Sequence, residues 1–231
     1  KTIYASPVFK AVPQSMHGYD VVNPYHINPE IGTEEELRDL IKHLHAIGIG
    51  WIQDIVPNHM AYHHTNLWLM DVLEKGSMSV YASFFDITWS GNFFNARLMA
   101  PFLATSLEEA IESKQLQIVY HQLSLFFKNG ENIYPLNSRS IERILSYDFD
   151  SAPDSIKQFV SQLEEIHHIE DTVAYTLHSR ELALQFSAMM KNEEVKNYIE
   201  HSLNIINDDD ENLKLIAGDQ FYRLCCWKEA D

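Results

Sequence analysis

The stretch Trp51–Met60, "WIQDIVPNHM", ends an apolar run with an aspartate and a histidine five residues apart, across a proline. With the two preceding residues the run reads "IGWIQDIV" over 49–56, which predicts a mostly apolar parallel strand covered by helices. Asp54 and His59 flank the end of this strand, where such a pair can order a polar ligand by accepting and donating hydrogen bonds. The pair alone leaves an alternative open, in which Asp54 caps the next turn and His59 is an ordinary polar residue.

The residues before this strand complete a β-α-β pattern. Residues 2–9, "TIYASPVF", predict a short buried strand, and residues 10–33 hold three prolines and two glycines, which predicts an irregular surface loop. A helix then begins after Thr33, which forms a capping-box pattern with Glu36, and it ends at Gly48. Its apolar face is formed at helical spacing by Leu37, Leu40, Ile41, Leu44 and Ile47. Functional groups of such units gather at the carboxyl ends of the strands, so the residues after each strand are the site candidates.

The loop between the two predicted strands carries the sequence "HGYD", residues 17–20. His17, Tyr19 and Asp20 make this loop aromatic and polar at once. Carbohydrate sites need this mixture, because a ring covers the C–H side of a sugar while polar groups bind its hydroxyls. Taken alone, the stretch is equally consistent with an ordinary turn around Gly18.

After about residue 66 the pattern changes. "NLWLMDVLEKG" predicts a short helix ending at Gly76, and residues 116–136 contain two β-rich runs around Asn129-Gly130, a strong hairpin signal. From Ser140 to Trp227 the pattern is mostly helical, with predicted segments near 155–168, 170–190, 193–206 and 212–228, and an acidic break at 207–211.

Composition excludes several classes of protein. Seventeen basic against 33 acidic residues give a formal net charge of −16, which argues against nucleic acid or an anionic membrane surface as a partner. Cys225 and Cys226 are adjacent, which suits neither a disulfide framework nor a C-x-x-C motif. No apolar run reaches the roughly 20 residues of a membrane span, and no signal peptide is visible. We therefore expect a cytoplasmic chain. Because "KTIYASP" reads as the inside of a strand, we also expect the chain to be a piece of a longer protein.

The 12 histidines raise the question of a metal site. His59 and His63 with a carboxylate would suit zinc if their segment were helical, but Pro57 predicts a loop and no H-E-x-x-H motif occurs. Scattered surface histidines are the favoured interpretation, and no metal or cofactor is expected. G-x-S-x-G and Walker motifs are also absent, so serine-hydrolase and P-loop functions lack support.

Several of these stretches resemble one known family. "YASPVFKAVPQSMHGYDVVNPYHINPEIGTEEEL" and "GIGWIQDIVPNHM" are similar to the second and third barrel strands of the α-amylase clan of (β/α)8 glycosidases. "DIVPNH" matches the first signature region of the clan. "NLWLMDVLEKGSMSVYASFFDITW", "LMAPFL", "YPLNSRSI" and "QFYRLCCWK" resemble the maltooligosyltrehalose synthase family within it. Gln53 is a minor departure, because an aliphatic residue usually precedes the aspartate.

The resemblance implies an isomerase of trehalose biosynthesis, which converts the terminal α-1,4 bond of a maltooligosaccharide into an α-1,1 bond. The implied mechanism is retaining, with a covalent glycosyl-enzyme and re-attack by the released glucose in a site that excludes water. Carried over to matching positions, Tyr19 would stack on the sugar, His59 would bind near its primary hydroxyl, and Asp54 would orient the site from below. The same resemblance gives His17, Asp20 and Asn58 supporting roles in the loops.

The resemblance also implies what this chain lacks. The family's nucleophile, general acid and transition-state-stabilising aspartate belong to later signatures that do not occur here, so no catalytic residue is assigned and this chain alone is expected to be inactive. The expected fold is α/β: residues 1–66 as a partial (β/α)8 barrel contributing strands 2 and 3, and residues 67–231 as a mostly helical inserted subdomain with a β-hairpin near 115–136. The expected ligand is a maltooligosaccharide or other α-glucan; oligomeric state is not indicated. Alternatives are another α-glucan hydrolase or transferase of the clan, a non-catalytic carbohydrate-binding module and, more distantly, a metal-dependent hydrolase.

Overall fold

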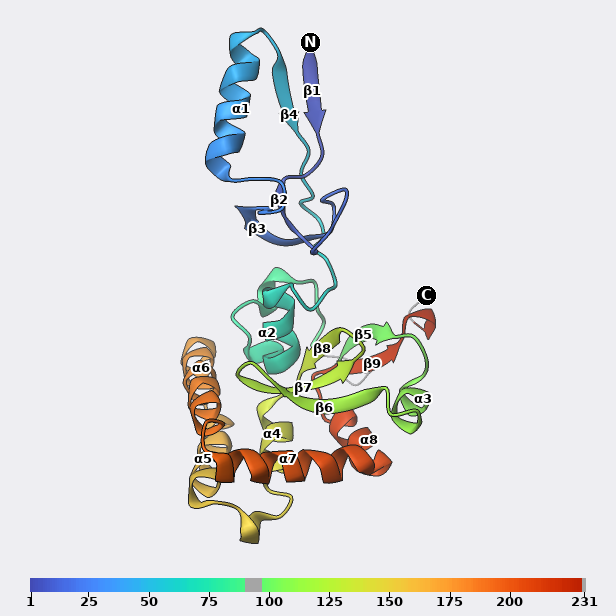
Figure 1. Ribbon diagram of the computed structural model, residues 1–231, viewed down its shortest axis with the longest axis vertical. Coiled ribbons are helices and arrows are strands. Elements are labelled where there is room, and N and C mark those ends of the chain that lie inside the picture. Colours follow the sequence, from blue (N-terminus) through green and yellow to red (C-terminus); the bar gives the residue numbers. More distant parts are fainter. Residues whose placement is uncertain (90–96, 230–231) are drawn as a thin grey trace. The chain divides into compact units, whose positions relative to one another are not determined.

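The computed structural model describes residues 1–89 and 97–229. The chain divides into two compact units, Lys1–Leu69 (unit 1) and Met70–Asp231 (unit 2), and the boundary falls inside a helix. Each unit has its own set of strands and helices (Figure 1). The roles predicted for residues 1–66 and 67–231 remain predictions, and the two units are described separately.

Unit 1 contains the predicted β-α-β pattern. Its elements in chain order are β1 (Thr2–Ala5), β2 (Phe9–Ala11), β3 (Val21–Ile27), α1 (Glu34–Ala46) and β4 (Gly50–Gln53). Strands β1 and β4 pair in parallel, from Thr2 opposite Gly50 to Ala5 opposite Gln53. The parallel arrangement requires a crossover, and residues 6–49 with α1 supply it.

The prediction of a wholly irregular loop over residues 10–33 was wrong. Strands β2 and β3 pair there as an antiparallel ribbon with irregular register: Phe9 lies opposite Ile27, Lys10 opposite Asn23 and Ala11 opposite Val21. Pro24 falls within the irregular part, where a missing backbone N–H breaks no regular ladder. The buried apolar side chains of this region are those of Val8, just before β2, and of Ala11, Val21 and Val22 in the ribbon.

The start of α1 is as predicted, and its predicted apolar face is not buried within unit 1. The Thr33 N–H donates to Glu36 Oε2 over 2.7 Å and the Glu36 N–H donates to Thr33 Oγ1 over 3.2 Å, which is the capping box. However, no residue of α1 is buried, and Leu40 is 48% exposed. Within unit 1, one helix and a two-stranded sheet are too small to cover each other, so most of the surface of α1 and of the β1-β4 sheet stays open.

The strand predicted over 49–56 is likewise shorter and less covered than expected. Pairing with β1 ends at Gln53, and Ile52 and Ile55 are 53% and 57% exposed. Only one neighbouring strand is present in the described part of unit 1, so apolar composition by itself did not define the length of the strand.

Unit 2 combines helices with two small sheets. The elements that follow β4 are α2 (Leu67–Lys75), η1 (Gly76–Met78), η2 (Ala82–Phe84), β5 (Leu98–Leu103), α3 (Leu107–Glu112), β6 (Leu116–His121), β7 (Ser124–Asn129), β8 (Asn132–Pro135), α4 (Ser138–Leu145), η4 (Phe149–Ser151), α5 (Asp154–Ile166), α6 (Thr172–Met189), α7 (Glu193–Asp208), α8 (Asp210–Gly218), β9 (Tyr222–Cys226) and η5 (Trp227–Glu229). The helix predicted to end at Gly76 is α2. Within the described residues, no helix combines the length and the apolar character that crossing a membrane requires.

The hairpin around Asn129-Gly130 is confirmed, and it is part of a larger sheet. Strands β7 and β8 flank this turn, and Gly130 has φ +59°, a value that glycine adopts readily. The preceding β-rich run is itself two-stranded: β6 and β7 pair from Leu116–Asn129 to His121–Ser124, around a second turn at Gln122. The result is the antiparallel sheet β6-β7-β8.

The prediction of a helix over 212–228 was wrong beyond Gly218. Helix α8 ends there, and Tyr222–Cys226 forms β9, which pairs in parallel with β5. Strand β5 lies about 120 residues earlier, so a local pattern carries no signal for this pairing. The other late helices, α5, α6 and α7, lie close to their predicted segments, and in Figure 1 α7 runs alongside the sheet at β6.

Candidate functional site

The carboxyl ends of β1 and β4 lie side by side, and Asp54 is the first residue after the paired segment. Its backbone N–H donates to the Ala5 carbonyl over 2.9 Å, which continues the parallel ladder by one bond. Beside it, the Gln53 side-chain amide donates to the Ser6 carbonyl over 2.7 Å and to the Asp54 carbonyl over 3.0 Å. Gln53, which departs from the family pattern, therefore ties the two strand ends together next to Asp54.

The Asp54 carboxylate accepts hydrogen bonds from three groups. Tyr19 Oη donates to Oδ2 over 2.7 Å, the Ile55 N–H donates to Oδ1 over 2.9 Å, and the Tyr4 hydroxyl is a further partner. These bonds favour the charged form, so the Tyr19 hydroxyl first and Tyr4 second hold the pKa of Asp54 below its usual range. By the same contact, the Asp54 carboxylate raises the pKa of both tyrosines.

This geometry assigns Asp54 an anchoring role. An ionised carboxylate with about four acceptor positions keeps little capacity once three donors are bound. Its lowered pKa makes it a poor proton donor near neutral pH. The tyrosine rings remain open to solvent, with Tyr19 40% exposed and Tyr4 66% exposed. The arrangement is thus two aromatic faces held by one fixed anion, which suits binding rather than proton transfer.

The loop that delivers Tyr19 is shaped by Gly18. Gly18 has φ +77°, and a Cβ at this position would lie 2.3 Å from the Pro7 carbonyl oxygen, so only glycine fits this turn. The Gly18 N–H donates to Ser15 Oγ over 3.1 Å, and that hydroxyl donates to the Asp20 carboxylate. The Asp20 carbonyl also accepts from the Val12 N–H over 3.0 Å, so both ends of this residue bond within the loop.

His17 lies on the exposed side of the same loop. Its Nδ1 accepts the Tyr19 N–H over 3.0 Å, and the two rings are 6.0 Å apart and tilted by 40°. The same ring nitrogen lies 3.7 Å from Asp20 Oδ1. His17 thus helps to orient the backbone that precedes the Tyr19 ring.

Asn58 and His59 are exposed and contact each other, with His59 Nδ1 3.3 Å from Asn58 Oδ1. Among the described residues, no hydrogen bond joins either of them to Tyr19 or Asp54. The structure therefore brings Tyr19 and Asp54 together directly, connects His17 and Asp20 through the loop, and leaves Asn58 and His59 as a separate exposed pair after β4.

Tyr4 is the site residue that sequence reasoning missed. In the parallel register Tyr4 lies opposite Ile52, two residues before Asp54. A diagonal neighbour two positions away is within reach of a long aromatic side chain. The alignment of the two strand ends, combined with a tyrosine in "TIYASP", was the available signal.

The histidines suggested as an alternative metal site have other contacts. The His63 and His64 rings lie 4.1 Å apart, and His63 Nδ1 is 2.8 Å from Thr65 Oγ1. Burial, aided by His64, lowers the pKa of His63. In residues 1–89 and 97–229, no group of three or more His, Cys, Asp or Glu side chains is placed to hold a metal ion.

Curated proteins that are similar to this chain in sequence include one described as a trehalose synthase and one described as an α-amylase. A curated protein of Mycobacterium tuberculosis (strain H37Rv), described as a putative maltooligosyl trehalose synthase, is 39% identical over 110 residues, which are 47% of this chain and 14% of that protein. Alpha-amylase 2 of Dictyoglomus thermophilum is 46% identical over 61 residues, 26% of this chain and 10% of that protein. The chain therefore spans a small part of the length of these relatives.

Comparison with solved structures extends the similarity along the whole chain. The DSM5389 glycosyltrehalose synthase aligns with 99% of this chain and 23% of its own chain, with 27% identity and a TM-score of 0.61. A hypothetical maltooligosyl trehalose synthase of Sulfolobus tokodaii aligns with 98% of this chain and 21% of its own, with 28% identity and a TM-score of 0.56. The family model described as alpha amylase, catalytic domain, matches residues 1–129, more than half of the 231 residues. This chain belongs to the α-amylase family.

Proposed function

We propose that this chain is part of an enzyme that converts the terminal α-1,4 bond of a maltooligosaccharide into the α-1,1 bond of a trehalose end group. Two features support the proposal. The site pairs exposed aromatic rings with a fixed carboxylate, as a sugar requires. Relatives described as maltooligosyl or glycosyl trehalose synthases match this chain in sequence and in structure.

The proposed roles follow the contacts of each side chain. Tyr19 stacks on a glucose ring, and Asp54 fixes the Tyr19 ring through its hydroxyl. Asp20 and His17 hold the loop that carries Tyr19. Asn58 and His59, exposed after β4, supply hydrogen bonds to sugar hydroxyls.

Unit 1 on this proposal is part of a (β/α)8 barrel, with β1 and β4 as its second and third strands, and unit 2 is an insertion that covers the substrate cleft in the complete enzyme. A closed barrel needs eight strands and a retaining glycosidase mechanism needs two carboxyl groups about 5 Å apart. The strands of the described residues close no barrel, and Asp54 is already bound by three donors. We therefore expect this chain alone to bind glucan without transforming it.

The observation that carries the proposal is the 2.7 Å bond between Tyr19 and Asp54, which joins the "HGYD" loop to the "DIVPNH" strand end. The direct test is titration of the isotopically labelled chain with maltotriose, followed by NMR shifts. We expect saturable shifts at Tyr19, Asp54 and His59, which Tyr19→Ala abolishes, and none with the β-linked control cellotriose. Equal shifts with both sugars, or shifts confined to unit 2, would contradict the assignment of this site.

A second candidate is hydrolysis of α-glucans, favoured by the 46% identity to an α-amylase over 61 residues. A longer polypeptide containing this chain, incubated with maltopentaose, separates the two activities. A non-reducing product ending in an α-1,1 bond supports the synthase, whereas free glucose or maltose supports a hydrolase. The present chain serves as the control, and product formation by it alone would refute the expected lack of catalytic carboxyl groups.

A further inference from the structure

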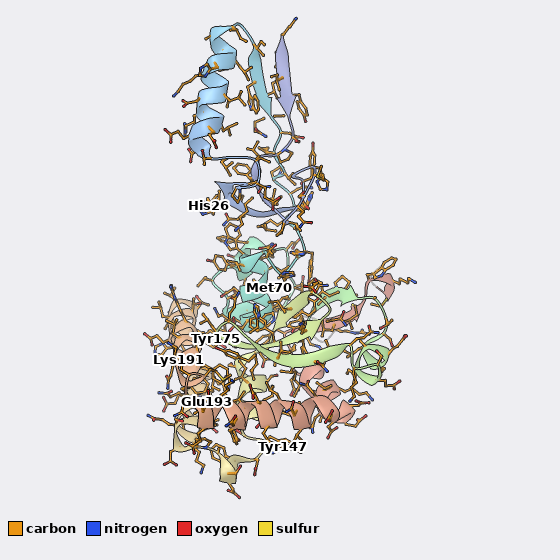
Figure 2. The ribbon with its side chains drawn as sticks, in the orientation of Figure 1. His26, Met70, Tyr147, Tyr175, Lys191 and Glu193 are labelled. Atoms are coloured by element: carbon orange, nitrogen blue, oxygen red, sulfur yellow. The ribbon has the colours of Figure 1, made fainter. Side chains whose placement is uncertain are left out.

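Unit 2 contains a small cavity that is separate from the candidate sugar site. It encloses about 30 Å³, and its walls come from α2, α4, α5, α6 and the turn between β6 and β7. Most of the lining is apolar, including Ile141, Phe159, Leu163 and Phe186. Four polar or charged residues also line it, namely Glu74, Ser138, Tyr175 and Ser179. Figure 2 labels Tyr175, which lies on α6.

Glu74 is the acidic residue among those that line this cavity, and its side chain is partly exposed to solvent. Its carboxyl forms no hydrogen bond or ion pair with any residue in the described part of the chain. Burial accordingly raises the pKa of Glu74 to about 7, and the nearby Lys75 charge opposes this effect only in part. A carboxyl group in apolar surroundings without a partner is costly to ionise.

The neighbouring lysine is already engaged. Lys75 Nζ pairs with the Asp71 carboxylate, which also accepts from Ser79 Oγ, and the side chains of Lys75 and Asp71 are only 8% and 16% exposed. Helix α2 therefore presents two carboxyl groups here and one ammonium group, and the ammonium group pairs with Asp71. Arg139 of α4 is exposed, and the other cavity walls bring no cation. Among the described residues, no lysine or arginine side chain pairs with Glu74.

The hydroxyl groups around the cavity can accept hydrogen bonds from such a cation. Ser138 Oγ lies 3.4 Å from Tyr175 Oη, a long contact that leaves both oxygens able to accept another donor. Ser179 Oγ donates to the Tyr175 carbonyl over 2.8 Å, so its lone pairs are free to accept. Burial raises the pKa of Tyr175, which keeps its hydroxyl neutral.

The size of the cavity limits what it can take. A water-sized group needs about 10–15 Å³ of such space, so 30 Å³ holds about two groups of that size. An ammonium group bonded to one methyl or methylene group has this size, and its carbon end would contact the apolar walls. A bare metal cation would need six or more oxygen ligands, which a mostly apolar wall does not supply.

We propose that this cavity is a binding site for the ammonium end of a small primary amine, with Glu74 as its counter-ion. The three –NH₃⁺ hydrogens are donated to the Glu74 carboxylate and to the hydroxyl oxygens of Ser138 and Tyr175. The alkyl part packs against Phe159 and Phe186, whose rings stack 5.3 Å apart. The site is independent of the sugar-binding proposal, since every lining residue belongs to unit 2.

The test uses the 231-residue chain and methylammonium chloride as the probe, at constant ionic strength and pH 8. We expect saturable shifts of the Glu74 side-chain ¹³C signal, a lower apparent pKa of Glu74, and a higher melting temperature. Glu74→Gln keeps the shape of the side chain and should weaken binding about tenfold or more. Glu181→Gln, an exposed change on α6, is the matched control and should leave binding unchanged.

Ser138→Ala provides a second variant if Glu74→Gln does not fold, and it should weaken binding several-fold because one acceptor is lost. Effects of methylammonium that are equal to those of sodium chloride, or unchanged in both variants, would overturn the proposal. Equal effects of potassium chloride would also overturn it, because they would show a simple monovalent cation site with no role for the apolar walls.

Discussion

At the scale of single residues, the candidate site depends on which groups surround one carboxylate. Asp54 stands at the strand end that the sequence indicated, and its role follows from Tyr19, Tyr4 and the Ile55 N–H. These donors stabilise the anion. A carboxyl group without donors, that of Glu74 in its mostly apolar cavity, has a raised pKa instead. Hydrogen-bond donors at Asp54 and burial at Glu74 therefore shift the pKa values of the two carboxyl groups in opposite directions.

Replacing Tyr19 by Phe should raise the pKa of Asp54, because the largest stabilising hydrogen bond of the carboxylate is lost. A depressed folded-state pKa stabilises the fold above the unfolded-state value and loses this effect as pH falls through the folded-state value. Tyr19→Phe should thus flatten the acid side of the stability profile. The ¹³C titration of the Asp54 carboxyl measures the shift, with Tyr25→Phe as a control on another exposed tyrosine. An unchanged titration in Tyr19→Phe would contradict the geometry.

Gly18 and Gly48 offer a matched test of the "HGYD" turn, since their φ values are +77° and +74°. Gly48→Ala meets nothing within 4 Å and should cost about 1 kcal/mol, the ordinary penalty for a left-handed alanine. Gly18→Ala should cost more, because its Cβ would lie 2.3 Å from the Pro7 carbonyl oxygen. Hydrogen exchange of the β1 and β4 amides reports the stability of unit 1 in both variants. Equal losses would show that the turn relaxes freely.

Glu74 predicts a pH dependence of opposite sign to that of Asp54. Its folded-state pKa of about 7 lies above the unfolded value near 4.5, so its stabilising effect is full below about pH 4.5 and is lost as pH rises through about 7. Asp71 and Lys75 on α2, Tyr175 on α6 and Arg139 on α4 are the nearby titratable and charged groups. In urea unfolding, Glu74→Gln should gain stability relative to the wild type between pH 5 and pH 8. A constant difference across this range would refute the raised pKa.

At the scale of elements, the capping box placed α1 correctly, because Thr33 and Glu36 act within one turn. Strand β6 makes a contact with α7 that no local sequence pattern predicts. It is an edge strand of the sheet β6-β7-β8. The Ile118 N–H donates to Asn207 Oδ1 of α7 over 2.7 Å, and Asn207 Nδ2 donates to the Ile118 carbonyl over 2.8 Å. A side-chain amide thus replaces a neighbouring strand at this edge.

Asn207→Ala should destabilise unit 2 by about 1–3 kcal/mol, because the Ile118 N–H and carbonyl lose their partners in a half-buried position. Asn204→Ala, an exposed change one turn earlier on α7, is the control and should have little effect. Urea unfolding of the two variants gives the difference. A loss in Asn204→Ala as large as in Asn207→Ala would indicate an effect on the helix rather than on the strand edge.

At the scale of the whole molecule, the two units differ in how well their helices are buried. Helix α1 of unit 1 has no buried residue, whereas α7 of unit 2 buries Val195, Tyr198, Ile199, Ser202, Leu203 and Ile206. Buried apolar contacts are the main source of local stability, so the units should open with different free energies.

Native-state hydrogen exchange should therefore show α1 amides exchanging faster than α7 amides, by at least about tenfold. The central residues of each helix are compared, so that fraying ends do not contribute. Mass spectrometry of peptides from residues 36–46 and 195–206 gives the two rates. Equal protection would show that unit 1 is stabilised by contacts other than those of α1.

The sequence by itself determined the features that depend on neighbours along the chain. The capping box at Thr33, the hairpin at Asn129-Gly130 and the β-α-β order each follow from interactions within a few residues or from a crossover of fixed length. The motifs around Tyr19 and Asp54 also placed the candidate site at the strand ends. Roles for Asn58 and His59 there remain a prediction.

Only the tertiary structure decided the features that depend on distant partners. Strand β9 forms because β5 lies beside it, about 120 residues away in sequence, although its own segment was predicted as helix. Tyr4 joins the site because the parallel register of β1 and β4 brings its hydroxyl to Asp54. Burial raises the pKa of Glu74, which lines a cavity built from five separate segments. Pairing, register and burial are set by chain segments that meet only after folding, and a local pattern therefore cannot specify them.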